Sequence, residues 1–207
     1  MRIGIFSGGT GSTQLQEGLA QFPSIEITHF LNAYDDGKST GVVRDVFNVL
    51  GPSDIRKIQY NKWKLKKISN EGIEWLFESR EDITDKDKIY GKLYKYHFEG
   101  FIPDFEEFYS NFTGSQNQLK DFSLANILYA SKFKKIGYEK TIEYFNDFLG
   151  VFSDIKLNSF ENEKLSAVLT DRTILSDEAS IVSLNDSTKR RGFFSSFSNN
   201  KVFLKSS

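Results

Sequence analysis

At the start of the chain, the spacing of apolar positions changes from that of a strand to that of a helix and back again. A short apolar run over residues 2–6 is followed by a glycine-rich turn and then by residues 12–21, where Leu15 and Leu19 share one helical face. A second β-rich run extends over residues 25–32. Because the order is strand, helix, strand, the pattern predicts a βαβ unit and a parallel sheet.

In the middle of the chain, apolar residues recur at spacings of three and four, the period of amphipathic helices. The recurring stretches are residues 73–77, 89–98, 105–112, 122–133 and 138–149. We therefore expect a helical insertion over about residues 60–150. Residues 33–56 are instead rich in Asp, Gly, Ser and Thr, which predicts a long polar connection of the kind that usually carries function.

The last part of the chain has two short β-like runs at residues 165–169 and 173–175, after which Ser, Asn and Lys dominate. We therefore predict one α/β domain over residues 1–184 and a mobile polar tail over residues 185–207. The domain is expected to be a three-layer Rossmann-like fold with a mainly parallel sheet.

Composition narrows the classes of partner. The chain has 207 residues with 20 Phe and 9 Tyr, so a core with a large aromatic share is expected. With 27 basic and 28 acidic residues the net charge is −1, which disfavours nucleic acid as a partner. No run approaches the roughly 18–20 apolar residues of a membrane span, and the first glycines come too early for a signal peptide. A cytoplasmic protein without a membrane partner is expected.

Two residue types that often carry chemistry contribute little here. The chain has no Cys, which excludes disulfides, thiolate zinc sites and cysteine nucleophiles. His29 lies in a predicted strand and His97 lies among aromatic residues at helical spacing. Both are expected to be packed or surface side chains rather than ligands.

A glycine-rich loop joins the first predicted strand to the first helix and comprises Gly8, Gly9, Thr10 and Gly11. Such a turn presents backbone N–H groups and the positive end of a helix dipole, which together favour a phosphate. The loop matches only two glycines of the dinucleotide fingerprint, because Gln14 occupies the third position, and it lacks the Lys of a P-loop. The alternative interpretation is a tight strand-to-helix turn without a ligand.

A second polar motif follows the second predicted strand, at the edge of the sheet where open α/β folds bind ligands. Asp35 and Asp36 are adjacent carboxylates suited to Mg²⁺. Ser39, Thr40 and Arg44 can donate hydrogen bonds to phosphate oxygens, Arg44 as a bidentate fork. The alternative is an Asp-Gly turn with solvated charges, which does not explain the later Ser, Thr and Arg.

A third motif runs over residues 51–56 and places Asp54 two residues before Arg56. Asp54 either caps a helix or adds a carboxylate to a metal site.

These motifs, in this order over residues 3–56, resemble the 2-phospho-L-lactate transferase and gluconeogenesis-factor family, also called CofD-like. The segments that carry the resemblance are residues 8–11, 18–19, 35–44 and 52–56, with the later segments 123–128 and 176–181. Three positions depart from the family pattern: Gln14, Lys57 in place of a common Asn, and Ala125 in place of the Gly before Asn126. Family members generally continue for about another hundred residues, including a Pro-Gly-Ser loop.

The resemblance implies a transferase that moves a phospholactyl-type group from a guanosine diphosphate donor to a deazaflavin hydroxyl with Mg²⁺. Its implied roles concern three sets of residues. The metal ligands are Asp35, Asp36 and Asp54; the catalytic residues are Asp35, Asp36 and Arg44; the ligands of a nucleotide diphosphate such as GDP are Gly8, Gly9, Thr10, Gly11, Ser39, Thr40, Arg56 and Asn126.

Two alternatives to the transferase remain open. Another branch of the family resembles a non-catalytic regulator that binds a nucleotide sugar or an NAD-like metabolite. A degenerate subunit that retains the fold and binds nothing is the third possibility. The short chain also predicts a homo-oligomer or a partner chain that supplies the missing C-terminal half.

Overall fold

The structure is a computed structural model of the 207-residue chain, and it describes residues 1–8, 12–22, 24–32, 34–162, 165–169, 172–175, 181 and 193–195. The strands are β1 (Arg2–Ser7), β2 (Glu26–Leu31), β3 (Arg80–Glu81), β4 (Phe122–Ser123), β5 (Asp154–Leu157), β6 (Leu165–Val168), β7 (Ile174–Leu175) and β8 (Phe193–Ser195). The α-helices are α1 (Thr13–Ala20), α2 (Lys38–Phe47), α3 (Ser53–Lys64), α4 (Glu71–Glu78), α5 (Lys86–Lys95), α6 (Ile102–Asn111), α7 (Leu124–Ile136) and α8 (Tyr138–Leu149), with 3-10 turns η2 (Glu99–Phe101) and η3 (Gln116–Leu119).

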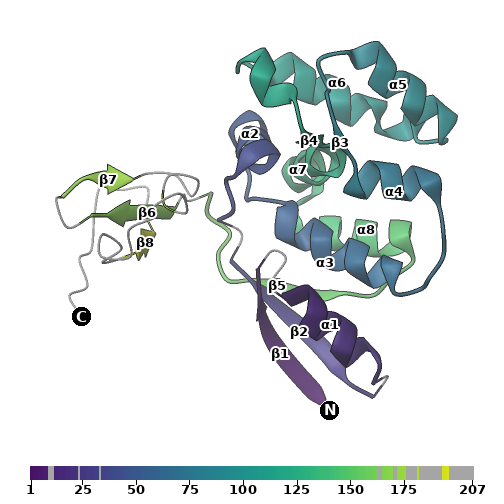
Figure 1. The fold of residues 1–207 in the computed structure, drawn as a ribbon, viewed down its shortest axis with the longest axis vertical. Helices are drawn as coiled ribbons and strands as arrows, with labels where there is room; N and C mark the ends of the chain where they lie inside the picture. The colour runs from purple at the N-terminus through teal and green to yellow at the C-terminus, as the bar shows by residue number, and fades with distance from the viewer. Residues whose placement is uncertain are drawn as a thin grey trace.

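The N-terminal sheet is parallel, with the strand order β1-β2-β5 (Figure 1). This confirms the predicted mixed α/β fold with a parallel sheet. The strand β5 was not predicted, and it pairs with β2 so that Ile155 lies opposite His29. Along β1 and β2 the residues of one face are buried, whereas Phe6 on the other face is 90% exposed. The described residues therefore cover this sheet chiefly on one face.

The predicted helical insertion is observed, but it begins earlier than expected. Residues 33–56, expected to form a long polar connection, contain α2 and the first turn of α3. The difference arises because α2 buries Val42, Val43 and Phe47 on one face and packs along α7. These three apolar residues lie among polar residues, and the polar residues led to the prediction of a loop. Figure 1 shows α2 lying beside α7 above the sheet.

An aromatic cluster forms the centre of the helical region. Tyr129 and Phe145 stack with ring centroids 3.8 Å apart, and Phe77 meets both rings edge-on at 6.3 and 6.1 Å. All three side chains are fully buried. Offset-stacked and edge-on pairs are the favourable arrangements of aromatic quadrupoles, so this cluster orients α4, α7 and α8 as well as burying apolar surface.

Helix α1 packs with a different face from the one that its leucines predict. Leu15 is 51% exposed, whereas the polar side chain of Gln16 is buried. The apolar periodicity of this segment was therefore a poor guide to its orientation.

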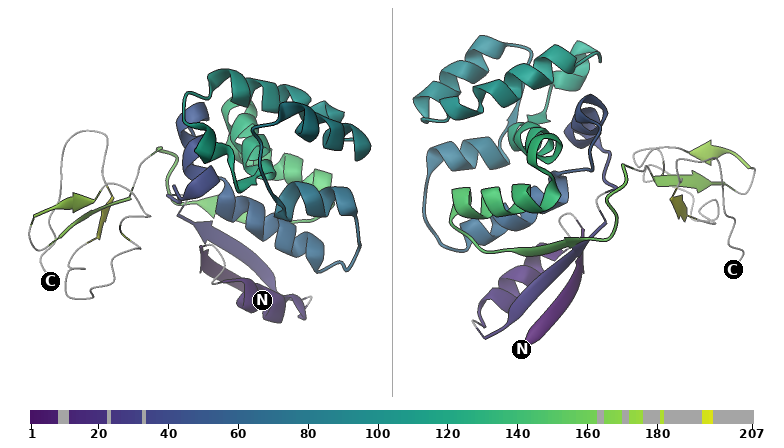
Figure 2. Two further views of the ribbon diagram at one scale, coloured as in Figure 1. Left: turned by 45° about the horizontal axis from the view of Figure 1, so that its top comes forward. Right: turned by 180° about the vertical axis from the view of Figure 1, so that it is seen from behind.

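A second small sheet has the antiparallel strand order β7-β6-β8 and lies to one side of the helical region (Figure 2). It confirms the predicted β-like pair at residues 165–169 and 173–175. Its third strand, β8, falls within the predicted polar tail. The rest of residues 185–207 lies outside the described residues.

Within the described part of the chain, no helix combines the length and apolarity that a membrane crossing requires.

Truncating the aromatic cluster should strongly destabilise the fold. We expect Phe145→Ala to lower the free energy of unfolding by about 3–5 kcal/mol, because the cavity it leaves adds to the lost transfer free energy. Tyr94→Ala is the matched control, since Tyr94 is 61% exposed, and it should change stability by less than about 0.5 kcal/mol. Denaturant unfolding measures both. Equal effects of the two variants would contradict the role assigned to the cluster.

His29 should make the fold sensitive to acid. Burial, and secondarily the charge of Lys62, lowers the pKa of His29 to about 4, with Asp154 opposing this. Since the folded-state pKa lies below that of the unfolded chain, protonation favours unfolding, and stability is lost as the pH falls from about 6.5 towards 4. Between about pH 7 and about pH 5 the loss from His29 should reach about 2 kcal/mol. Denaturant unfolding of His29→Gln should show a correspondingly flatter pH dependence.

Candidate functional site

Three motifs from separate parts of the sequence meet near the carboxyl ends of β1 and β2. Gly8 directly follows β1, and a Cβ placed on it would lie 3.9 Å from Oδ2 of Asp54, in the first turn of α3. Asp35 lies in the connection that leaves β2 and enters α2. Gly9, Thr10 and Gly11 lie outside the described residues. The start of α3 thus brings the third motif next to the first.

The turn before α2 is organised by Asp35. Its Oδ1 accepts a hydrogen bond from the backbone N–H of Gly37 at 3.0 Å, and its Oδ2 accepts one from the Thr40 hydroxyl at 3.5 Å. Lys38 has a left-handed backbone with φ 45°, and it pairs at 2.6 Å with Asp121, which has φ 53°. Non-glycine residues in this conformation are strained, and such strain concentrates at functional sites.

The predicted ligand Asn126 links this turn to the start of α7. Its Nδ2 donates to Ser39 Oγ at 3.2 Å and to Thr40 Oγ1 at 3.3 Å, and all three side chains are buried. Its Oδ1 has no hydrogen-bond partner among the described residues, and neither does the buried Oγ of Ser123. Buried polar atoms are normally paired, so the two oxygens without a partner mark this place as a candidate binding site.

Two arginines add positive charge to the same place. Arg80 donates from Nη1 to Ser39 Oγ at 3.3 Å. Arg56 is buried, donates to the carbonyl of Phe77, and has an Nε without a partner among the described residues. Burial lowers the pKa of Arg56 to about 10, and the charge of Arg80 adds to this, while Asp54 is among the groups that oppose it. An anion bound here would relieve the repulsion between the two arginines.

Arg80 was missed at the level of sequence. It lies in the mixed-charge stretch 78–88, which is typical of a solvated helix surface. The segment instead contains the short strand β3, which pairs antiparallel with β4 and places Arg80 opposite Ser123, next to the start of α7. No local motif marks such a pairing between segments far apart in the chain.

Arg44 was predicted to hold phosphate with a bidentate fork, but its guanidinium is used within the protein. Nη1 donates to the carbonyl oxygens of Tyr34 and Asp35 at 2.9 and 3.3 Å, and Nε and Nη2 donate to Asn162 Oδ1 at 3.1 and 2.9 Å. The side chain is fully buried, and burial lowers its pKa. In this arrangement Arg44 shapes the loop that carries Asp35.

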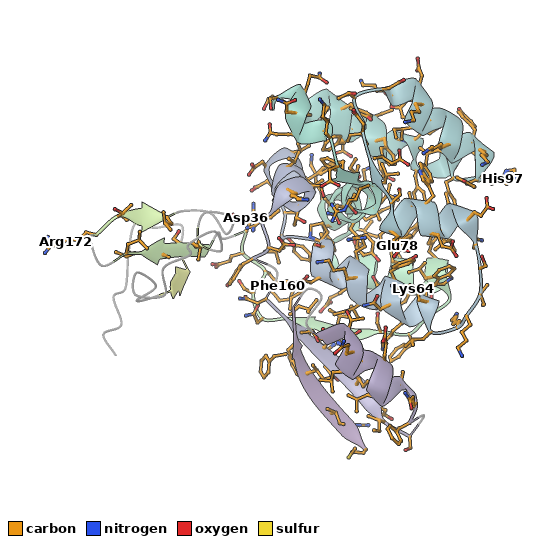
Figure 3. All side chains as sticks on the ribbon, in the orientation of Figure 1. Asp36, Lys64, Glu78, His97, Phe160 and Arg172 are labelled. Atoms are coloured by element: carbon orange, nitrogen blue, oxygen red, sulfur yellow. The ribbon has the colours of Figure 1, made fainter. Side chains whose placement is uncertain are left out.

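The three predicted metal carboxylates do not form one ligand set. Asp36 lines a cavity of about 540 Å³ beside α2 and η3, whose wall also includes Ser39, and Figure 3 shows Asp36 at the turn below α2. Asp54 lies 3.6 Å from Lys57 in an ion pair. Among the residues that the structure describes, no cluster of three or more His, Cys, Asp or Glu side chains is placed to hold a metal ion. Asp35 is the carboxylate that faces the hydroxyl of Thr40.

The start of α2 should not tolerate any side chain at Gly41. A Cβ there would lie 2.2 Å from the carbonyl oxygen of Asp36. We expect Gly41→Ala to displace the turn and destabilise the protein by about 1–3 kcal/mol. Gly91→Ala in α5 is the matched control, because it meets nothing within 4 Å, and it should be neutral or stabilising by up to about 1 kcal/mol. Thermal unfolding of both variants checks this; a Gly41→Ala protein as stable as Gly91→Ala would contradict it.

Several known proteins are similar to this chain. A gluconeogenesis factor from Halalkalibacterium halodurans is 27% identical over 187 residues, which cover 90% of this chain and 47% of the relative. The gluconeogenesis factor of Bacillus subtilis is 31% identical over 83 residues, 40% of this chain and 26% of the relative. The chain therefore spans less than half the length of these curated relatives.

A solved structure of a Bacillus halodurans protein has a similar fold, with a TM-score of 0.60 and 25% identity over 86% of this chain and 46% of that one. A second structure of the same Bacillus halodurans protein, described as a member of the UPF0052 family, gives a TM-score of 0.63 at 23% identity, over 89% of this chain and 47% of that one. The sequence profile described as 2-phospho-L-lactate transferase CofD matches residues 3–202. The chain therefore belongs to the 2-phospho-L-lactate transferase CofD family.

Proposed function

We propose that this protein binds a nucleotide diphosphate together with Mg²⁺ in the polar cluster formed by Asp35, Ser39, Thr40 and Asn126, and that it acts as a transferase of the phospholactyl type. The observation that carries the proposal is the set of buried polar atoms without partners around this cluster, namely Asn126 Oδ1, Ser123 Oγ and Arg56 Nε among the described residues. Leaving such groups unpaired costs about 1–3 kcal/mol each, so a ligand that satisfies them binds favourably.

The cluster suits a diphosphate for two reasons. Helices α2 and α3 start here, and neither of their N-cap residues, Gly37 and Pro52, caps its helix with a side chain. Their first N–H groups and the positive ends of their dipoles favour a bound anion. The guanidinium groups of Arg56 and Arg80 supply positive charge at the same place. The Gly8 to Gly11 loop is proposed to add backbone N–H groups.

The donor set also fits Mg²⁺, which prefers oxygen ligands and is usually held by one or two carboxylates completed by phosphate oxygens and water. Asp35 is the carboxylate of the cluster, the hydroxyl of Thr40 lies 3.5 Å from its Oδ2, and Asn126, which donates to Thr40, adds an amide oxygen to the same cluster. A bound Mg²⁺ would neutralise the charge on a leaving phosphate. Asp36 and Asp54 then contribute to Mg²⁺ binding through bridging water or through their negative charge.

The second candidate function is a non-catalytic regulator that binds a nucleotide sugar or an NAD-like metabolite. The names of the matched relatives from Halalkalibacterium halodurans and Bacillus subtilis, both gluconeogenesis factors, favour this alternative. Both functions use the same phosphate cluster and a cytoplasmic location. The transferase additionally needs an acceptor pocket, which we propose is completed by a second copy or by a partner chain.

Isothermal titration calorimetry with GDP, UDP-N-acetylglucosamine and NAD, each with and without Mg²⁺, tests the proposal. GDP binding that depends on Mg²⁺ supports the transferase, and metal-independent binding of the nucleotide sugar or NAD supports the regulator. Asn126→Ala should weaken binding by about tenfold or more, because it removes a buried polar ligand and releases Ser39 and Thr40. Asp87→Asn, in the first turn of α5, is the control and should leave affinity unchanged.

If none of the three nucleotides binds to the wild-type protein, both functions are wrong and the degenerate subunit is the remaining interpretation. Binding that Asn126→Ala and Asp35→Asn leave intact would show that the nucleotide occupies another place.

A further inference from the structure

A cavity of about 840 Å³ lies between α1, the sheet, the end of α3 and residues 150–154. Its walls include the first residue of each parallel strand, Arg2, Glu26 and Asp154. The cavity is therefore at the amino ends of the strands, whereas Gly8 and Asp35 follow their carboxyl ends. Its volume falls in the range of small-molecule sites, roughly 300–1,000 Å³.

Two buried polar side chains in the wall have an atom without a partner among the described residues. His29 is fully buried; its Nδ1 lies 3.0 Å from Ser7 Oγ, while Nε2 has no partner. Gln16 is 5% exposed; its Nε2 donates to Ser12 Oγ at 2.8 Å, while Oε1 has no partner. Buried polar atoms are normally paired, so two without a partner in one cavity wall need an explanation.

The remaining lining is apolar on one side and carries charges of both signs, with Arg2, Lys62 and Lys66 against Glu26 and Asp154. Leu19, Ile27 and Val151 offer aliphatic surface. Lys62 donates to the carbonyl of Phe152 at 2.9 Å, which uses one of its three N–H donors and holds the ammonium at the cavity. A ligand that satisfies these groups has an apolar body, an anionic group for Lys62 and a hydrogen-bonding group for Gln16 and His29.

We propose that this cavity is a second binding site, for a small organic acid with an apolar body and a hydroxyl or amino group. The carboxylate pairs with Lys62, the hydroxyl or amino group donates to Gln16 Oε1, and His29 Nε2 completes the polar contacts. The apolar body of such a ligand packs against the aliphatic wall, and its polar groups pair with Gln16 Oε1 and His29 Nε2, which otherwise have no partner among the described residues. The site is independent of the nucleotide function proposed for the Asp35 cluster.

The two histidines of the chain allow a direct test by NMR of the imidazole signals. His29 lines the cavity, and His97 is exposed near the far end of α5, as Figure 3 shows, so it is an internal reference. Phenyllactate is the probe, because it has a carboxylate, a hydroxyl and an apolar ring. We expect it to shift the His29 signals saturably and to leave those of His97 in place, while phenylethanol, which lacks the carboxylate, shifts neither.

Variants separate specific binding from other effects. Lys62→Met should weaken phenyllactate binding by about tenfold, as should Gln16→Leu, because each removes one polar contact. Lys64→Met is the matched control on the same helix, exposed and outside the cavity wall, and should bind as the wild type does. Asp35→Asn should also bind phenyllactate normally.

The proposal is wrong if phenyllactate leaves the His29 signals unchanged, or if Lys62→Met and Lys64→Met bind it equally. Loss of phenyllactate binding in Asp35→Asn would place the probe at the nucleotide cluster and would likewise overturn the second site. Neither outcome bears on nucleotide binding, which the calorimetry measures separately.

Discussion

The arrangement of the candidate site depends on the buried guanidinium of Arg44. A buried cation needs hydrogen-bond partners, and Arg44 donates to two main-chain carbonyls of the loop after β2 and to the side chain of Asn162. The same contacts fix the path of residues 34–35 and join them to the segment that leaves β5. The loop therefore holds Asp35 where it accepts hydrogen bonds from Gly37 and Thr40. The Thr40 hydroxyl in turn accepts a hydrogen bond from Asn126.

Much of the fold could be predicted from local patterns, and the failures have identifiable causes. The order strand, glycine loop, helix, strand is encoded in consecutive residues, and so are the helices from α4 to α8, whose aromatic spacing is regular. Helix α2 was missed because its buried face includes Ser39, Thr40 and Arg44 as well as apolar residues. Strand β5 was missed because it is short and its partner β2 is more than a hundred residues earlier.

Several residues of the candidate site could be identified from the sequence, but the contacts that each of them makes could not. Local motifs identified Asp35, Ser39, Thr40 and, through the family resemblance, Asn126, which the fold brings together. Sequence spacing could not reveal that Arg44 points inward, since that depends on Asn162, 118 residues away. Nor could it separate Asp35 from Asp36, because a one-residue difference in a turn sends adjacent side chains in different directions. Arg80 comes to the site only because two very short strands, β3 and β4, pair with each other.

The exposed face and outer edge of the parallel sheet have a consequence for handling the protein. In the described residues β1 pairs on one side only, with β2, and the ring of Phe6 meets that of Phe30 on the uncovered face, tilted by 35° with the centroids 5.6 Å apart. An unpaired strand edge beside exposed aromatic rings is a template for intermolecular strand addition. Among the described residues β1 is therefore the edge at which a further strand can pair, and a charged substitution at Phe6 would oppose such pairing.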